Sequence, residues 1–301
     1  MPGLFSWLIR TGLPLVPKPI VGRVARRYVA GETLDQALAT IADLGRDGTM
    51  ATMDLLGEEV HAREKALAAA AEYERMLDAI AERKLEANIS VKLSALGLKI
   101  DEGFCQENLE RIVASARRHG NFVRVDMEDY TTTDATLRMV HELHPRYGNL
   151  GPVLQAYMRR TLADISRLPA AGVNVRLCKG IYIEPRAVAY KAYETVRHNF
   201  LVALEKLLAR GVYVGIATHD EHLVCGALGL IDRYQVPRER YEFQMLLGVE
   251  PELRRILLAQ GHRLRVYVPY GRDWYPYSTR RLRENPDVAK HVLRAMLLRR
   301  S

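Results

Sequence analysis

Two adjacent arginines near the C-terminal end of the chain have the spacing of an anion-binding face. The stretch YGRDWYPYSTRRLREN, residues 270–285, is typical of a helix that starts near its aspartate and proline. On such a helix Tyr277, Arg280, Arg281 and Glu284 share one face. Paired guanidinium groups match a planar carboxylate through two hydrogen bonds, whereas a solvated row of ion pairs needs no ligand. The pattern alone permits both interpretations.

Three more cations, Lys92, Arg176 and Lys179, follow or end predicted strands and could converge with the arginine pair on one anion. The expected ligand is then a carboxylate or a phosphate. Lysine also allows a different chemistry, because a desolvated lysine can form a Schiff base with a carbonyl substrate. A class I aldolase acting on a carboxylate substrate is therefore the alternative enzyme.

A metal site is a further alternative, made from HDEH at 219–222 together with Asp126 and Glu128. Successive side chains at a strand end point to opposite faces, so we expect no metal there. The HELH pair, His141 and His144, is predicted to lie on the outer, solvated face of a helix.

Composition limits the classes of protein that fit. The chain has 301 residues, 48% hydrophobic and 27% charged, which is ordinary for a globular protein with a large core. Its net charge of +8 is spread along the sequence, which favours anionic small molecules or a membrane surface over nucleic acid. A basic scaffold for acidic partners is the non-enzymatic alternative.

The cysteines indicate a reducing, cytoplasmic setting. Cys105, Cys178 and Cys225 are too few and too scattered for a disulfide framework. Cys178 lies in an apolar run, where we expect a buried small side chain without a redox role.

The N-terminal 45 residues are predicted to form a helical segment ahead of a catalytic barrel at 46–301. Prolines and basic residues break its apolar runs, so none approaches the ~20 residues that a membrane-spanning helix needs. The first 30 residues and the stretch DVAKHVLRAMLLRRS are basic and amphipathic. We expect both to pack on the barrel, with peripheral contact at the inner face of a membrane as the alternative.

These chemical groups must be positioned by a regular alternation of strands and helices. Eight apolar or β-branched runs read as buried strands: TMATMDLLG, NISVKLSALG, NFVRVDMED, PVLQAYM, VNVRLCKGI, YVGIATHD, YEFQMLLG and LRVYVPYG. Helical stretches lie between them, most ending in a glycine that suits a C-cap: 58–84, 107–120, 187–211 and 250–261.

Strict alternation implies parallel strands with right-handed crossovers. Eight units in roughly 250 residues predict a closed (β/α)8 barrel of the TIM type. An open doubly wound sheet is the alternative, but the sequence has no G-x-G-x-x-G to support a dinucleotide crevice.

In such a barrel the carboxyl ends of the strands surround the active site. Polar residues recur there: Asp54, Glu58, Lys92, Ser94, Asp126, Glu128, Gln155, Tyr157, Arg176, Lys179, Tyr182, Thr218, His219, Gln244 and Tyr267. One such residue is more often part of a plain ion pair than of chemistry. Charges at most of the strand ends are harder to explain that way, because burying a charge is costly.

The motifs at these strand ends resemble those of the proline dehydrogenase family. DLLGE, SVKLSALG, VRVDMED, LQAY, VRLCKGIY, ATHD, EFQML and YVPYG followed by YSTRRLREN match in order and span residues 54–285. Each motif is weak alone, but eight in register on consecutive predicted strands make chance an unsatisfactory explanation. The resemblance implies a distorted (β/α)8 barrel with N-terminal helices and a C-terminal helix over the barrel mouth.

It also implies an FAD enzyme that oxidises L-proline to 1-pyrroline-5-carboxylate and passes the electrons to a membrane quinone. By resemblance, the carboxylate of proline would be held by Lys92, Arg280 and Arg281, and its ring by Tyr182, Leu246, Tyr267 and Tyr277. Lys92, Asp126, Arg176 and Tyr182 would be catalytic. FAD would contact Asp126, Gln155, Arg176, Lys179, Gly180, Thr218, His219, Gln244 and Glu284. Glu58 and Arg280 would form an ion pair that closes the site.

Some positions depart from the family's pattern or refine it. Ile181 stands where members often have alanine, which affects the expected width of the pocket. The tract between Tyr267 and Tyr277 has the short form of small monofunctional members, and Tyr267 is the residue expected for proline rather than hydroxyproline. Since the flavin would accept the hydride, the protein's own task would be to orient the substrate and to set the local charge.

Overall fold

Eight parallel strands close into a barrel, as the alternating pattern predicts. The computed structural model describes residues 27–57, 59–169, 172–275 and 277–278. Neighbouring strands pair in sequence order, and β8 pairs with β1 to close the sheet. The strands are β1 (Met50–Leu55), β2 (Ala87–Val91), β3 (Val123–Val125), β4 (Leu150–Gln155), β5 (Asn174–Cys178), β6 (Tyr213–Ala217), β7 (Tyr241–Leu246) and β8 (Leu264–Tyr270).

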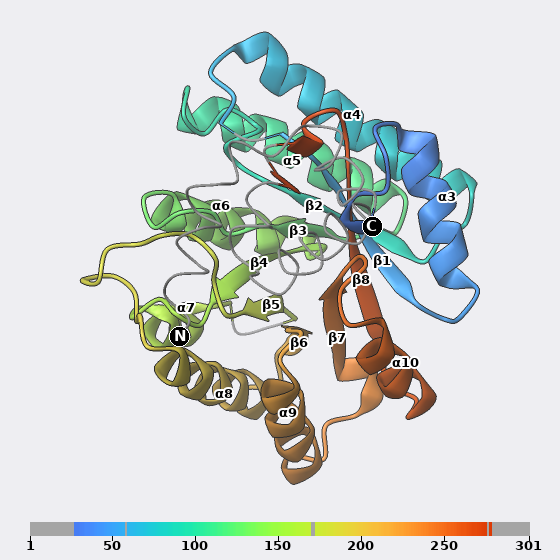
Figure 1. The fold of residues 1–301 in the computed structure, drawn as a ribbon. Helices are drawn as coiled ribbons and strands as arrows, with labels where there is room; N and C mark the ends of the chain where they lie inside the picture. The colour runs from blue at the N-terminus through green and yellow to red at the C-terminus, as the bar shows by residue number, and fades with distance from the viewer. Residues whose placement is uncertain (1–26, 58, 170–171, 276, 279–301) are drawn as a thin grey trace, which may run out of the picture.

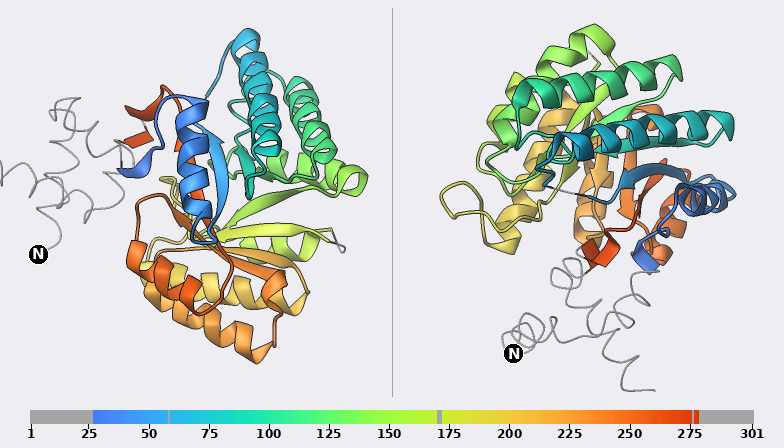
Figure 2. Two further views of the ribbon diagram at one scale, coloured as in Figure 1. Left: turned by 90° about the vertical axis from the view of Figure 1, so that its right-hand side faces the viewer. Right: turned by 90° about the horizontal axis from the view of Figure 1, so that it is seen from above.

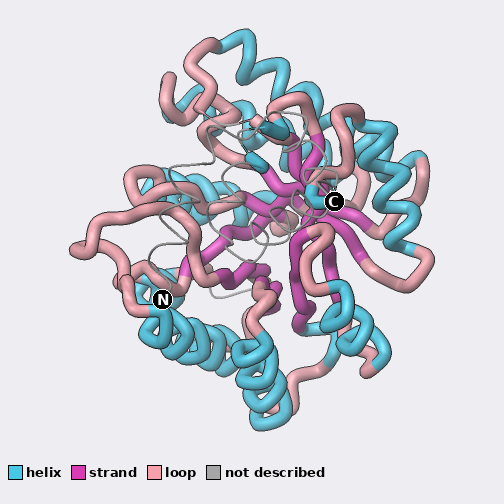
Figure 3. The backbone as a smooth tube through the Cα atoms, viewed as in Figure 1, coloured by secondary structure: helices cyan, strands magenta, loops and turns pink. Residues whose placement is uncertain are grey.

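The helices surround this barrel (Figures 1 and 3), and two turned views show the same arrangement (Figure 2). They are α3 (Leu34–Gly45), α4 (Arg63–Glu82), α5 (Glu102–Arg118), α6 (Thr133–Tyr147), α7 (Thr161–Arg167), α8 (Tyr193–Ala209), α9 (Glu221–Arg233) and α10 (Pro251–Ala259), with a 3-10 turn, η2 (Arg238–Arg240), before β7. Each of the strands β1 to β7 is thus followed by a helix before the next strand, as a (β/α)8 barrel requires.

Local sequence explains where several helices begin and end. Thr33 caps α3, since its hydroxyl accepts the Gln36 N–H while the Gln36 side chain accepts the Thr33 N–H. Gly148 follows α6 with φ of 72°, a left-handed conformation that favours glycine. The predicted glycine helix ends are confirmed here by Gly120 and Gly211, which also have positive φ.

The two faces of the strands differ in chemistry. Residues such as Met53, Ile89 and Val125 belong to the apolar core that the surrounding helices cover. The alternate positions face the barrel interior and are largely polar, with Arg124 and Glu242 almost fully buried. An ordinary barrel interior is filled with Val, Ile and Leu, so this polar interior calls for a chemical explanation.

Two expectations about helices are corrected. The helix before β6 begins at Tyr193 rather than near residue 187, because residues 179–192 form the loop that borders the barrel mouth. His144 is buried, and its Nδ1 lies 3.0 Å from the Leu150 carbonyl oxygen, so only its partner His141 is exposed.

Other expectations fall outside the described residues. They concern residues 1–26 and the helix predicted across the mouth beyond Ser278. In the portion that is described, no helix combines the length and apolarity needed to cross a membrane.

Candidate active site

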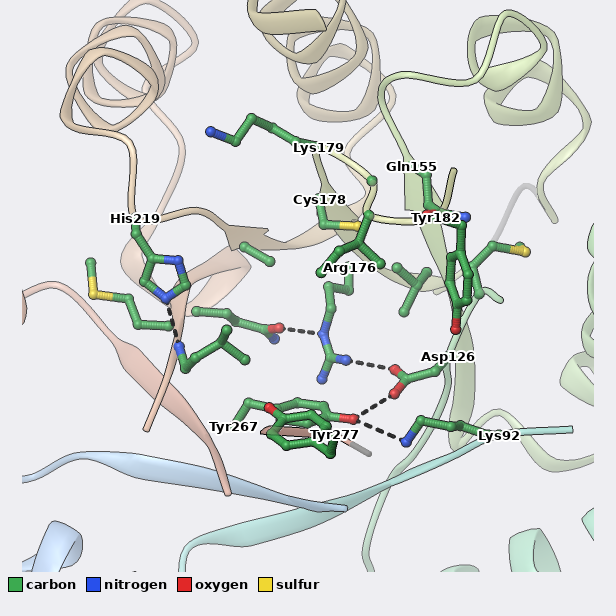
Figure 4. Close-up of a pocket in the computed structure, with 18 residues that line it drawn as sticks. Lys92, Asp126, Gln155, Arg176, Cys178, Lys179, Tyr182, His219, Tyr267 and Tyr277 are labelled. Carbon is green, nitrogen blue, oxygen red and sulfur yellow. Dashed lines mark hydrogen bonds and ion pairs between the residues drawn. The ribbon is translucent and has the colours of Figure 1, made fainter. Parts of the chain in front are cut away.

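A cavity of about 250 Å³ opens at the carboxyl ends of the strands, where the sequence predicts the site (Figure 4). Its volume is near the lower end of the usual range for ligand sites, about 300–1,000 Å³. Its lining includes every described residue of the predicted site except Thr218: Lys92, Asp126, Gln155, Arg176, Lys179, Gly180, Tyr182, His219, Gln244, Leu246, Tyr267 and Tyr277.

Asp126 is the centre of the polar network in this cavity. Its Oδ1 accepts from Nη1 of Arg176 at 2.7 Å, and its Oδ2 accepts from the Tyr267 hydroxyl at 2.8 Å. The Ser90 hydroxyl donates to Oδ1 at 2.6 Å. Since β3, β5 and β8 are not neighbours in the sheet, the bonds to Arg176 and Tyr267 cross the barrel interior. The carboxylate therefore fixes two side chains from distant parts of the chain.

Arg176 is held on two sides. Its Nε donates to Oε1 of Gln244 at 2.5 Å, opposite the bond from Nη1 to Asp126. Its guanidinium carbon lies 5.2 Å from the centre of the Tyr267 ring. Nη2 has no hydrogen-bond partner among the residues that the structure describes, and Arg176 lines the cavity. A rigid cationic donor is thus available to a bound molecule.

Lys92 forms a buried ion pair beside this network. Its Nζ donates to Asp54 Oδ1 and lies 3.5 Å from the Tyr267 hydroxyl. Asp54 is completely buried, and burial raises the pKa of its carboxyl to about 6 against the opposing charge of Lys92. The pair therefore places the ammonium group of Lys92 at the cavity wall, next to the Asp54 carboxyl group, whose ionisation is opposed by burial.

Two tyrosines form an aromatic wall. Burial raises the pKa of Tyr267 well above its usual value, and the nearby charge of Asp126 adds to the effect. The Tyr267 hydroxyl therefore stays protonated and donates to Asp126. Tyr277 lies beside Tyr267 in Figure 4 and packs with Val29 and Leu56. Such aromatic faces suit the apolar part of a small ligand.

His219 follows the end of β6 and lies across the cavity from Lys92 and Asp126 (Figure 4). Its Nε2 accepts the backbone N–H of Leu246 at 2.7 Å. A ring nitrogen that accepts a hydrogen bond carries no proton, so the neutral imidazole is protonated at Nδ1. The bond to β7 thereby orients the His219 ring. Among the residues described here, no group of three or more His, Cys, Asp or Glu is arranged to hold one.

The loop after β5 approaches the cavity closely. Gly180 has φ of +106°, and a Cβ there would lie 2.3 Å from the Tyr157 ring, so only glycine fits. The neighbouring Lys179 donates to Asp220 at 3.0 Å. Burial alone would raise the pKa of Asp220, but bonds from Arg197, Tyr193 and Lys179 hold it well below its usual value. Lys179 is therefore anchored as a cation at the cavity edge.

The remaining predicted residues are placed as follows. Gln155 lines the cavity, and its amide donates to the Glu128 carbonyl at 2.9 Å. Thr218 is buried but does not line the cavity, and its hydroxyl accepts the N–H of Asp220 at 3.1 Å. Four predicted residues lie outside the described part of the chain: Glu58, Arg280, Arg281 and Glu284.

Some side chains of the site were not assigned a role from the sequence. The sequence pattern predicts Asp54 only as a polar strand end and makes no prediction for Ser90. Ser90 lies two positions before Lys92, so the period of two along a strand could have identified it. The prediction that Cys178 is buried is wrong. Its side chain is only half-buried and lines the cavity rather than lying within the apolar core.

Comparisons with known proteins agree with this geometry. The family model described as proline dehydrogenase matches residues 37–294. Proline dehydrogenase 1 of Bacillus subtilis (strain 168) is 37% identical over 273 residues, covering 91% of this chain and 90% of that protein. Proline dehydrogenase of Deinococcus radiodurans is 37% identical over 279 residues, with the same two shares.

A crystal structure of proline utilization A from Bdellovibrio bacteriovorus, inactivated by N-propargylglycine, matches the fold with a TM-score of 0.82 at 24% identity. The match covers 87% of this chain and 32% of that one. On the family match and on the two relatives of similar length, this chain belongs to the proline dehydrogenase family of oxidoreductases.

Proposed function

We propose that this protein oxidises L-proline to 1-pyrroline-5-carboxylate, with FAD as the bound cofactor and a membrane quinone as the final electron acceptor. The observation that carries the proposal is Arg176, which Asp126 and Gln244 hold at the cavity with one nitrogen available to a ligand. Family membership favours proline as the substrate, because the relatives that cover the chain are named proline dehydrogenases.

The donor set fits a flavin. A flavin ring gains negative charge when it is reduced, and a fixed guanidinium at Arg176 would stabilise that charge. Lys179 is a cation at the cavity edge and would be a partner for the phosphates of FAD. Gln155 and His219 would complete the cofactor contacts. The bound flavin would supply the two-electron acceptor that amino-acid side chains lack.

The chain's own residues would bind and orient proline. Lys92, with Arg280 and Arg281, would hold the carboxylate, and Tyr267 and Tyr277 would flank the ring. In this arrangement the ring carbon beside the nitrogen would face the acceptor. The carbon loses a hydride and the nitrogen loses a proton, so a C=N bond forms. Fixing this geometry can lower the barrier by about 7 kcal/mol or more.

One experiment separates this function from its alternatives. The purified protein is expected to be yellow and to lose that colour when proline is added without oxygen. A colourless protein that borohydride traps on a carbonyl substrate would instead be a Schiff-base aldolase using Lys92 or Lys179. If neither occurs and the protein binds an acidic polymer tightly, it would be a scaffold.

The carboxylate clamp is tested by Arg281→Met. The KM for proline is expected to rise by much more than tenfold, because the carboxylate loses a charge-assisted partner. An unchanged KM would remove Arg281 from the clamp.

Hydride loss is easiest from a neutral amine. We therefore expect kcat/KM for proline to rise with pH through the ionisation of the substrate amine, measured in buffers of constant ionic strength. A flat profile across alkaline pH would contradict this expectation.

A further inference from the structure

A second layer of charge lies below the cavity, on the inner face of the barrel. We call Arg124, Asn174, Tyr213, Glu242 and Arg265 the floor layer. Each lies two residues before an inward-facing position, and that position lines the cavity in every case except Gly215, which follows Tyr213. Glu242 is its main acceptor, at 2% exposure. Arg265 contacts both carboxylate oxygens at 2.7 and 3.1 Å, and the Tyr213 hydroxyl donates to Oε2 at 2.9 Å.

The floor layer is joined to the cavity through one amide. Nε2 of Gln244 donates to Oε1 of Glu242 at 2.6 Å. The other end of the same amide, Oε1, accepts from Nε of Arg176 at 2.5 Å. A continuous row of hydrogen bonds therefore runs from Glu242 to the guanidinium that faces the cavity.

The ionised Glu242 and the guanidinium of Arg176 select the same orientation of this amide. Burial would raise the pKa of Glu242, but the charge of Arg265 and the hydrogen bonds from Arg265, Gln244 and Tyr213 together lower it to about 2. An ionised carboxylate only accepts hydrogen bonds, so it selects the NH2 end of Gln244. The amide oxygen must then face Arg176, whose Nε can only donate.

The space around the amide is also restricted. Gly215 lies on the neighbouring strand β6, and a Cβ there would lie 2.4 Å from Nε2 of Gln244. Its backbone does not have a positive φ, so a conformational need does not explain the glycine. The absence of a side chain at this position leaves room for the amide to reach Glu242.

We propose that Glu242 is a positioning residue, which fixes the amide of Gln244 and thereby directs the guanidinium of Arg176 toward the cofactor. This inference rests on the proposed function, since it assumes a flavin beside Arg176. Glu242 itself lies outside the cavity lining and acts only through Gln244.

The test is the reduction potential of the bound flavin in Glu242→Gln, measured by equilibrium titration against a reference dye. An amide at position 242 can donate to Gln244 as well as accept from it and carries no negative charge. It therefore holds Gln244 less firmly against Arg176, so Arg176 stabilises the reduced flavin less. We expect the ratio of reduced to oxidised flavin at a fixed potential to fall at least tenfold, about 30 mV for a two-electron couple. We also expect kcat to fall while the KM for proline changes less than twofold.

The sign of the change in flavin reduction potential distinguishes a positioning role of Glu242 from a direct effect of its charge. Removing the carboxylate leaves Arg265 unpaired, and an added positive charge alone would favour the reduced flavin and raise the potential. A raised or unchanged potential in Glu242→Gln would therefore overturn the proposal. Gly215→Ala supplies a second variant that changes no charge, and it should lower the potential by crowding Gln244.

Tyr213→Phe is the matched control. It removes a donor from Oε2 of Glu242 and leaves the bond between Oε1 and Gln244 intact. Its flavin potential should equal that of the wild type, and a shift as large as that of Glu242→Gln would overturn the proposal. A wild-type protein without flavin would overturn the proposed function itself. A yellow wild type that proline reduces, with unshifted variants, would overturn only the role of Glu242.

Discussion

Asp54 and Glu242 are two buried carboxyl groups that face the same barrel interior and pair with a cation, yet their pKa values move in opposite directions. Burial raises that of Asp54 to about 6, whereas the donors around Glu242 lower its pKa to about 2. Asp54 accepts from Lys92 at Oδ1, and its Oδ2 has no hydrogen-bond partner among the described residues. Glu242 accepts from Arg265, Gln244 and Tyr213.

The two pKa values move in opposite directions because the two carboxyl groups have different numbers of hydrogen-bond donors, not because they are buried to different depths. Where donors satisfy the anion, as in the floor layer, the charge contributes to stability. Where one carboxylate oxygen is left without a donor, as at Asp54, the charge costs stability. The group that weakens the fold lies beside Lys92, which lines the cavity, as expected for a functional site.

The largest effect should come from breaking the floor ion pair. Arg265→Met leaves the Glu242 carboxylate buried without its cation, and we expect the free energy of unfolding to fall by about 3–5 kcal/mol. Urea unfolding followed by circular dichroism at neutral pH measures this. Arg138→Met, which breaks the exposed pair with Glu102, is the control and should cost less than about 1 kcal/mol. Equal losses of stability in both variants would contradict the idea that the buried pair matters more than the exposed one.

A smaller effect should appear in the pH dependence of Asp54→Asn. Between the unfolded pKa of about 3.9 and the folded value of about 6, the native state binds more protons than the unfolded chain. Asp54 therefore reduces stability as pH rises through this window, by about 3 kcal/mol in total.

The variant should gain stability relative to the wild type by that amount between pH 4 and pH 7, in urea unfolding at several pH values. Glu242 acts in the opposite sense, because its lowered pKa contributes stability above about pH 4.3 that is lost as pH falls toward 2. A difference between variant and wild type that does not change with pH would contradict the high pKa of Asp54.

The smallest effects should separate two tyrosines that both donate to carboxylates inside the barrel. Tyr213→Phe removes one of several donors to Glu242 and should cost about 1 kcal/mol of stability with unchanged kcat/KM for proline. Tyr267→Phe removes the donor to Asp126 at the cavity and should lower kcat/KM about tenfold at a similar cost in stability. Urea unfolding and steady-state kinetics on both variants measure these effects. An equal change in kcat/KM for the two variants would contradict the prediction.

The barrel could be predicted from sequence because its signals are local. Eight apolar runs with turn residues between them determine the strands, and helix-ending glycines such as Gly148 and Gly211 mark the connections. The start of α8 could not be predicted, because residues 187–192 are compatible with a helix but lie in the loop at the mouth.

The candidate site could be predicted only in part. Strand-end positions such as Lys92 and Gln244 follow from parallel topology, which brings them to one edge. The period of two also places Glu242 on the same strand face as Gln244, but the bond between the two side chains does not follow from it, because that bond depends on side-chain rotamers. The exposure of Cys178 to the cavity depends likewise on how neighbouring side chains fill the space.

The order in which the chain is made gives the last strand a particular importance. β8 supplies Arg265 to Glu242 and Tyr267 to Asp126, and it completes the barrel by pairing with both β7 and β1. Until it docks, the acidic groups of the interior lack these partners. Closure of the sheet and pairing of Glu242 with its cation are therefore one event, which favours all-or-none folding over a stable open intermediate. A chain that stops before Leu264 should accordingly be a substrate for proteases rather than a smaller folded domain.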